Sequence, residues 1–250
     1  MRKYLIWLIV LACLLAGCAA KPEPSKLTAN PYGEADFTYD GQWLRCLSGE
    51  AKTGIDVSIY QGDINWQAVA EAGIEFVIVR VGYRGSVDGA IHEDVNAAAN
   101  LQGALDAGLE VGAYFFSQAV TVEEAMEEAA FTLNAIAAYP ITMPVVFDWE
   151  HVDSETSRSA PIRDRTLLTD CALAFAQAVE TAGYRPMVYF NRYQARDLFD
   201  LEALADYGFW LAQYDTPMTF PWKIDFWQYS DQGTVDGIRG KVDLNLYFPA

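Results

Sequence analysis

Two carboxylates directly follow a short apolar strand pattern near the middle of the chain. The run Pro144–Glu150 reads Pro-Val-Val-Phe-Asp-Trp-Glu, so Asp148 and Glu150 are two residues apart. Side chains at this spacing in a β-strand point to the same face. Because unpaired buried carboxylates are strongly disfavoured, this pair indicates either a chemical role or a strand that has reached solvent. Paired acids are the usual catalytic groups of glycoside hydrolysis.

Recurrent apolar segments predict the strands that must position these acids. The predicted strands are Gly54–Val57, Ile74–Val81, Leu109–Phe116, Pro144–Trp149, Met187–Asn191, Phe209–Gln213, Asp225–Tyr229 and Val242–Asn245. Helical patterns lie between the first six of them, at Trp66–Glu71, Glu93–Ala107, Val122–Ala138, Asp164–Ala182 and Tyr193–Asp206. Gly73, Gly108 and Gly183 each close a helical pattern before an apolar run, which indicates repeated helix-to-strand joints and a parallel sheet.

The connections after the sixth predicted strand are too short for crossover helices. We therefore predict an α/β fold, a TIM-like (β/α) barrel of eight strands with about five flanking helices, trimmed in its last third. Asp56, Asp148 with Glu150, and Asp243 then stand at or near the C-terminal ends of the first, fourth and eighth strands. Since the first and eighth strands are neighbours in a closed barrel, the four acids are expected to line one cup.

The N-terminus has the composition of an export signal. Arg2 and Lys3 precede an apolar run from Leu5 to Leu15, which is too short for a comfortable membrane span. The sequence Leu-Ala-Gly-Cys that ends at Cys18 resembles the lipobox of bacterial lipoproteins. The polar, proline-containing stretch up to residue 30 is then expected to be a tether that needs no fold of its own.

The charge and cysteine content restrict the partners of the chain. Of its residues, 52% are hydrophobic and 14% aromatic, enough for a sizeable core, and the formal net charge is −17. So acidic a chain is not expected to bind nucleic acid. Cys46 and Cys171 remain in the exported domain, where either a disulfide or two separate thiols are possible.

Several short motifs resemble glycoside hydrolase family 25, the muramidase-type lysozymes, between about Thr53 and Phe248. They occur in the same order as in that family and lie at residues 54–66, 80–85, 113–117, 147–150, 210–214, 226–229 and 242–245. The resemblance implies a trimmed β/α barrel that cleaves the β-1,4 bond between N-acetylmuramic acid and N-acetylglucosamine in peptidoglycan. It implies no cofactor and no metal.

The resemblance also implies roles for the four acids. Glu150 matches the general acid that protonates the leaving oxygen, and Asp148 matches its partner, while Asp56 and Asp243 complete the set. Burial by Trp149 or other aromatic rings and crowding by the other acids would keep Glu150 protonated. Inversion by an activated water and a substrate-assisted route through the sugar acetamide both remain open.

Aromatic and amide side chains near the predicted strand ends are candidates for sugar contacts. The predicted substrate-binding residues are Tyr83, Tyr114, Asn191, Trp210, Gln213, Trp227 and Gln228. Any one of these rings could instead serve only in packing, and Asn191 could instead form a turn. His92 and His151 lack the neighbours of a metal site and are expected to be ordinary surface and loop residues.

The sequence thus predicts four regions. They are a lipoprotein signal peptide at residues 1–17, a tether at 18–30, an N-terminal extension at 31–52 and a catalytic barrel at 53–250. The expected protein is a monomeric peptidoglycan hydrolase, exported and held by its lipid on the outer face of the bacterial cell membrane. The alternatives are a surface lipoprotein that binds glycan without cleaving it, or a barrel glycosidase acting on another N-acetylated glycan such as chitin.

Overall fold

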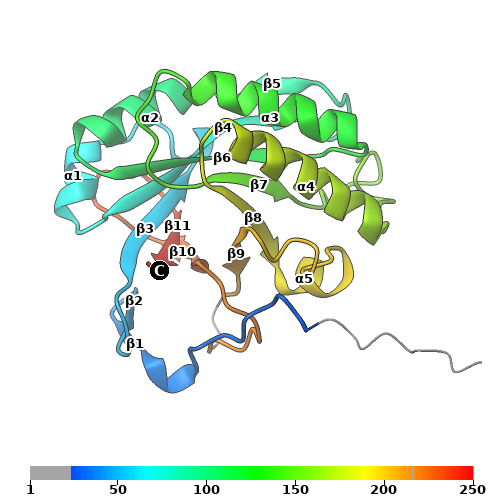
Figure 1. Cartoon of the computed structure of the whole chain (residues 1–250). Helices are drawn as coiled ribbons and strands as arrows, with labels where there is room; N and C mark the ends of the chain where they lie inside the picture. The colour runs from blue at the N-terminus through cyan, green and yellow to red at the C-terminus, as the bar shows by residue number, and fades with distance from the viewer. Residues whose placement is uncertain (1–23, 215–216, 250) are drawn as a thin grey trace, which may run out of the picture.

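The computed structural model describes residues 24–214 and 217–249, and in it eight strands close into a barrel (Figure 1). In order around the barrel, the strands are β3 (Lys52–Val57), β4 (Phe76–Arg84), β6 (Glu110–Ser117), β7 (Val145–Trp149), β8 (Pro186–Asn191), β9 (Gly208–Ala212), β10 (Phe226–Gly233) and β11 (Val242–Tyr247). The last of them pairs with the first, which closes the sheet. The predicted barrel of eight strands is confirmed.

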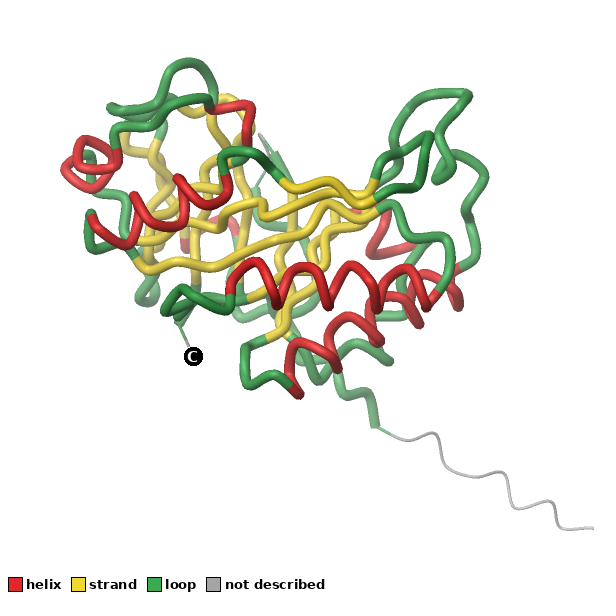
Figure 2. The backbone as a smooth tube through the Cα atoms, turned by 90° about the horizontal axis from the view of Figure 1, so that it is seen from above, coloured by secondary structure: helices red, strands yellow, loops and turns green. Residues whose placement is uncertain are grey.

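Helices cover the barrel on the side of its first five strands (Figures 1 and 2). The described helices are α1 (Trp66–Glu71), α2 (Ala97–Asp106), α3 (Val122–Ile136), α4 (Arg165–Thr181) and α5 (Arg192–Asp197), with two 3₁₀ turns at Glu34–Asp36 and Ile59–Gln61. The predicted glycine joints are present, since Gly73, Gly108 and Gly183 all have φ between 81° and 90°. Only glycine adopts this backbone conformation readily.

Two helices are shorter than predicted. Residues Ile91–Glu93 form β5, an antiparallel strand on the edge of β4, and α2 begins only at Ala97. In the intervening turn, the carboxylate of Asp94 accepts a hydrogen bond from the backbone amide of Asn96 (3.0 Å). This bond stabilises the turn in place of a first helical turn. Helix α5 ends at Asp197, after which the chain turns to bury the side chains of Leu198, Phe199, Leu201 and Leu204.

The final strand runs opposite to the direction that the sequence analysis assumed. The barrel strands β3, β4 and β6 to β10 are parallel to one another, but β11 is antiparallel to both β10 and β3. Residues 234–241, which join β10 to β11, are too few for a crossover, so the chain makes a hairpin. Asp243 therefore lies near the start of its strand, not at its C-terminal end as predicted. The reversed direction still brings it to the cup, directly opposite Asp56 in the strand pairing.

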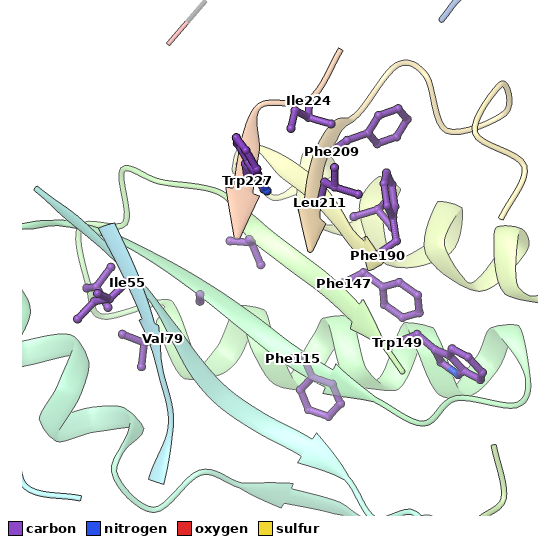
Figure 3. Packing of buried hydrophobic residues seen from close by; sticks show 14 of the residues in the cluster. Ile55, Val79, Phe115, Phe147, Trp149, Phe190, Phe209, Leu211, Ile224 and Trp227 are labelled. Carbon is purple, nitrogen blue, oxygen red and sulfur yellow. The ribbon is translucent and has the colours of Figure 1, made fainter. Parts of the chain in front are cut away.

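Side chains alternate between the two faces of the barrel wall. Outward-facing residues such as Phe115, Phe147 and Trp149 belong to the hydrophobic core that lies on the outer face of the strands (Figure 3). Inward-facing residues such as Phe76 and Phe226 fill the lower part of the barrel. The packing there is close, because a Cβ at Gly54 would lie 2.4 Å from the ring of Phe76. The polar residues above thus rest on a filled apolar floor.

The N-terminal extension forms a hairpin beside β3 and the last strands (Figure 1). Its strands are β1 (Phe37–Asp40) and β2 (Trp43–Cys46). The ring of Phe37 meets Trp227 edge-on at a centroid distance of 5.1 Å, and the ring centroids of Tyr32 and Phe248 are 4.7 Å apart. The hairpin thus covers outward-facing aromatic rings on a flank where the barrel has no helix.

The last residues of the predicted tether lie against the barrel, which the sequence analysis did not expect. Ala29 forms a bridge with Trp222, and the side chain of Ser25 donates a hydrogen bond to Glu202. The predicted signal peptide at residues 1–17 and the predicted lipidation site Cys18 lie outside the described residues.

Cys46 and Cys171 are both free thiols, so no disulfide joins them. Cys171 is fully buried in α4, where it fills space as a small apolar residue. Across residues 24–214 and 217–249, no helix is both long and apolar enough to cross a membrane.

Candidate functional site

A cavity of about 330 Å³ opens at the rim of the barrel, and all four predicted acids line it. Asp56 is the last residue but one of β3. Asp148 lies in β7, and Glu150 follows the last residue of β7. Asp243 reaches the same rim from the start of β11. The structure therefore brings together residues that are up to 187 positions apart in sequence, as the barrel prediction required.

Hydrogen bonds to the outward-facing Trp149 side chain and to two backbone carbonyl groups hold the end of β7 in place. The indole of Trp149 points away from the cup and donates a hydrogen bond to the carbonyl of Ala119 (2.9 Å). The expectation that Trp149 shields Glu150 is thus wrong, because residues next to each other in a strand face opposite sides. Side-chain amides of Gln118 and Gln194 donate to the carbonyl groups of Glu150 and Trp149, respectively.

Asn191 supports this arrangement and does not line the cavity. Its side chain caps α5 by accepting a hydrogen bond from the amide of Gln194 (3.0 Å), while the Gln194 side chain accepts from the amide of Asn191 (2.8 Å). This capping box fixes the glutamine that holds the end of β7. The structure thus favours a role for Asn191 in capping α5 over a contact with sugar.

Asp56 and Asp243 form a carboxylate pair between adjacent strands. One oxygen of Asp56, Oδ2, accepts hydrogen bonds from Nε2 of Gln228 (2.9 Å) and Nδ2 of Asn245 (2.8 Å). Burial, followed by the charge of Asp56, raises the pKa of Asp243 to about 9. Burial raises the pKa of Asp56 as well, but the hydrogen bonds from Asn245, Gln228 and Asp243 oppose this rise, so the proton of the pair resides on Asp243.

The β7 acids titrate well above the ordinary carboxyl range. Burial raises the pKa of Glu150 to about 7, with a further contribution from the charge of Asp56. Burial and then the charges of Glu150 and Asp56 raise the pKa of Asp148 well above its usual value. Oδ1 of Asp148 is buried and has no hydrogen-bond partner among the described residues. A carboxyl group that holds its proton near neutral pH is suited to general acid catalysis.

A chain of hydrogen bonds fixes the two amides that face Asp56. The hydroxyl groups of Tyr189 and Tyr214 both donate to Oε1 of Gln228, at 3.0 and 2.6 Å, so its Nε2 must point to Asp56. The indole of Trp210 donates to Oδ1 of Asn245 (2.9 Å), which orients that amide in the same way. Because each amide oxygen is already occupied by donors, each amide nitrogen is left to donate to the carboxylate.

Three of the seven predicted substrate-binding residues line the cavity. These are Tyr114, Trp210 and Gln228. The indole of Trp210 is only 2% exposed and meets Tyr114 edge-on at a centroid distance of 6.3 Å. Its buried position, together with its hydrogen bond to Asn245, indicates that it mainly holds other cup residues in place.

Three further predicted contacts lie elsewhere. Trp227 faces outward beneath the N-terminal hairpin, and its indole donates to the carbonyl of Gln213 (2.8 Å). The side chain of Gln213 donates to the carbonyl of Pro217 (2.6 Å), and Tyr83 stacks on His92 outside the cup. The motifs that carry these residues were correctly located, but strand alternation places only every second side chain inside the barrel.

Several residues of the cavity wall were not predicted. They include Ser58, Tyr60, Arg80, Tyr189, Tyr214 and Asp231. Two of them could have been found by alternation: Arg80 lies two residues beyond the inward-facing Ile78, and Tyr189 two residues beyond Met187. Arg80 carries the only positive charge among the described residues that line this cavity.

No group of three or more His, Cys, Asp or Glu residues within the described ranges is arranged to hold a metal ion. His92 bonds to Asp88 on the surface (3.1 Å). His151 lies in the loop after β7, where its ring contacts the carbonyl of Ile162 (3.0 Å). Both histidines thus occupy the ordinary surface and loop positions predicted for them.

The chain matches a family model described as Glycosyl hydrolases family 25 over residues 55–238. Lysozyme M1 of Streptomyces globisporus is 28% identical over 221 residues, which cover 78% of this chain and 67% of that protein. The modular autolysin LytC from Streptococcus pneumoniae has a TM-score of 0.69 at 25% identity, over 80% of this chain and 47% of its own. This chain therefore spans about half of LytC. A bacterial lysozyme from Streptomyces coelicolor has a TM-score of 0.62 at 26% identity, over 81% of this chain and 93% of its own.

The carboxylate pair predicts a specific dependence of stability on pH. In the unfolded chain Asp243 ionises near pH 4, whereas in the folded protein its pKa is about 9. The contribution of Asp243 to folding stability is therefore largest at acidic pH and falls as the pH rises from about 4 to about 9. Asp243→Asn removes this loss, because an amide can still donate to Asp56 but cannot ionise. The gain in Tm over the wild type should be larger at pH 8 than at pH 5 by at least about 4 °C.

Thermal unfolding followed by circular dichroism at both pH values measures this difference. Asp236→Asn is the matched control, since it makes the same change at an exposed position between β10 and β11. Equal gains at pH 5 and pH 8 for Asp243→Asn would show that Asp243 is already ionised in the folded protein.

Proposed function

Because the chain belongs to glycosyl hydrolases family 25, we propose that it is a muramidase that hydrolyses the β-1,4 bond between N-acetylmuramic acid and N-acetylglucosamine in peptidoglycan. The convergence of four carboxyl groups in one cavity at the rim of the barrel carries this proposal. Lysozymes of two Streptomyces species are among the similar proteins. Barrel enzymes place their reactive groups at this rim.

Glu150 is the general acid in this proposal. Its carboxyl group holds a proton up to about pH 7 and faces the cavity, so it can protonate the oxygen of the leaving sugar. The glutamines that bind the β7 carbonyls keep the Glu150 backbone in place while substrate binds. Fixed geometry of this kind lowers the cost of reaching the transition state.

Asp148 and Asp56 stabilise the reacting sugar in this proposal. The Asp148 carboxyl group lines the cavity, where it can accept a hydrogen bond from a donor on the substrate, such as the N–H of the sugar acetamide. This favours the substrate-assisted route, in which the acetamide oxygen attacks the anomeric carbon as the leaving oxygen takes the Glu150 proton. Asp56, fixed by two amides that favour its charged form, lies where it can stabilise positive charge on the ring.

Replacing the general acid tests this assignment. Glu150→Gln is nearly isosteric but cannot donate a proton, so hydrolysis should fall by about 10²–10⁴-fold while the fold is retained. Purified peptidoglycan is digested with the domain lacking residues 1–23, and mass spectrometry then identifies the sugar at each new reducing end. New N-acetylmuramic acid ends with the wild type, and almost none with the variant, are expected.

Chitin oligomers serve as the control substrate in the same experiment. Preferred cleavage of chitin would favour the alternative glycosidase, and full activity of Glu150→Gln would rule out this residue as the acid. Glycan binding without cleavage by the wild type would instead favour a non-hydrolytic surface protein.

We also propose that residues 1–17 are a signal peptide and that lipid on Cys18 anchors the domain to the outer face of the cell membrane. The position of the first described residues supports an orientation in which the cup points away from the membrane. Lys26 and Thr28 line a cavity together with Pro186 and Gly208, which are the first residues of β8 and β9. The chain therefore enters the barrel at the end opposite to the cup, so that the cup would point away from the membrane.

Metabolic labelling with a clickable palmitate analogue tests the anchor. The wild type and Cys13→Ala should incorporate the label, because Cys13 lies inside the segment that is removed. Cys18→Ala should incorporate none. Equal labelling of Cys18→Ala and the wild type would contradict the proposed lipidation site.

A further inference from the structure

A buried ion pair lies between the barrel and α3, outside the catalytic cup. Nε of Arg84, the last residue of β4, donates to Oε1 of Glu128 in α3 (2.7 Å). The side chains of Arg84 and Glu128 are 4% and 0% exposed. Taking two charges out of water is costly, and apolar side chains of similar size often stabilise a fold as well as such a pair does. Stability alone is therefore a weak reason for these charges, and the proposed hydrolysis does not use them.

A β-bulge directs Arg84 to this position. The pairing of β4 with β6 has a register shift between Arg80 and Gly82. Arg80 lines the cup, whereas Gly82 pairs with the outward-facing Phe115. A Cβ at Gly82 would lie 2.6 Å from the ring of Phe131 in α3, so this part of β4 faces the helix. The bulge thus sends one arginine of the strand into the cup and the other beneath α3.

The guanidinium group of Arg84 uses each of its nitrogens. Nη1 donates to the carbonyl of Gly89 (2.7 Å), and Nη2 donates to the carbonyl of Glu124 (2.9 Å) and to the carboxylate of Glu127 (3.1 Å). Arg158, in the loop after β7, donates to Oε1 of Glu124 (2.6 Å). The charged cluster therefore joins the turn after β4, helix α3 and the loop that follows the catalytic strand.

The same cluster holds both ends of the segment 117–120, which connects β6 to α3. Burial raises the pKa of Glu128 to about 7, and hydrogen bonds from Ser117 and Arg84 oppose this rise. The Ser117 hydroxyl also accepts the backbone amide of Ala119 (3.1 Å). At the other end, the backbone amide of Val120 donates to Oε2 of Glu124 (2.8 Å). The connection is thus fixed to buried or half-buried carboxylates on the side of α3.

The two middle residues of this connection hold the catalytic strand. The side chain of Gln118 donates to the carbonyl of Glu150, and the carbonyl of Ala119 accepts the indole N–H of Trp149 (2.9 Å). Gln118 and Ala119 are both 0% exposed. The four residues of the connection therefore bond to the charged cluster on one side and to the end of β7 on the other.

We propose that Arg84 and Glu128 form a positioning pair for the general acid, acting on Glu150 through the connection 117–120. The pair fixes the connection, and the connection fixes the backbone of Glu150. A fixed backbone keeps the Glu150 carboxyl group buried beside Asp56 and Asp148 in the cup. This inference rests on the proposed muramidase function and identifies what holds its acid in place.

Replacing both charges at once tests the proposal without leaving a buried charge unpaired. The double variant Arg84→Met, Glu128→Leu exchanges the pair for apolar side chains of similar size, so its Tm should stay within about 5 °C of the wild type. Its kcat on soluble glycan chains should fall about tenfold, because proton transfer depends on the placement of the acid. Its KM should change less than about twofold, since the cup residues that bind substrate remain.

The pH dependence of kcat separates positioning from a loss of folded protein. In the wild type, activity should fall above a pH of about 7, where Glu150 loses its proton. In the double variant, Glu150 becomes more exposed to water, which lowers its pKa, so this alkaline limb should move down by about one pH unit. The variant has no Glu128 to titrate, and a loss of folded protein would lower kcat without moving the limb.

Lys52→Met, Glu110→Leu is the matched control. This half-buried ion pair (2.6 Å) joins the first residues of β3 and β6 at the opposite end of the barrel, so its loss should leave kcat and the alkaline limb unchanged. Ser117→Ala keeps the positioning pair but removes its link to the connection. It should lower kcat about threefold and move the limb in the same direction, and it decides the question if the double variant does not fold.

The outcomes separate the two levels of the account. A folded double variant with the kcat or the alkaline limb of the wild type would overturn the positioning inference and leave the muramidase proposal intact. An unchanged limb in Ser117→Ala would do the same. Failure of the wild type to cleave the glycan chains would overturn the muramidase proposal itself.

Discussion

The burial of like charges at the mouth of the barrel is the constraint on which the rest of the structure depends. Asp56 and Asp148 are each only 5% exposed, and Glu150 and Asp243 line the same cavity. Carboxylates in such a place must either keep a proton or find a donor, because an unpaired buried charge is very costly. The cup uses both solutions, with protons retained at Glu150 and Asp243 and amide donors facing Asp56.

The surrounding architecture serves to keep these groups from moving apart. The apolar floor of the barrel supports them from below, and the tyrosine and tryptophan donors fix the two amides that face Asp56. The reversed strand β11 completes the arrangement, since it closes the barrel and places Asp243 opposite Asp56 without a crossover helix. The scaffold thus keeps the acids buried and close together, and this burial, with the repulsion between their charges, raises their pKa values.

Local patterns in the sequence were sufficient for the fold and for the four acids of the cup. Short apolar runs and helix-ending glycines located all eight barrel strands, and the spacing of Asp148 and Glu150 placed them on one face. The direction of β11 was missed because strand patterns carry no direction. Trp227 and Gln213 were misplaced because their motifs were read without the alternation of strand faces. Alternation from Ile78 places Arg80 inside the barrel but was not applied, whereas its partner Asp94 and the rings beside it meet it only in the folded chain. Long-range pairing of this kind leaves no local signal.

The most direct test of the account is the pKa of Glu150 in the folded protein. Carboxyl chemical shifts of the domain labelled with ¹³C at glutamate side chains can be followed by NMR from pH 3 to pH 10, with Glu150→Gln assigning the signal. We expect a midpoint of about 7, because burial and the charge of Asp56 hold the proton. A midpoint near 4.3, the value of an ordinary glutamate, would contradict the claim that crowding in the cup prepares this residue as an acid.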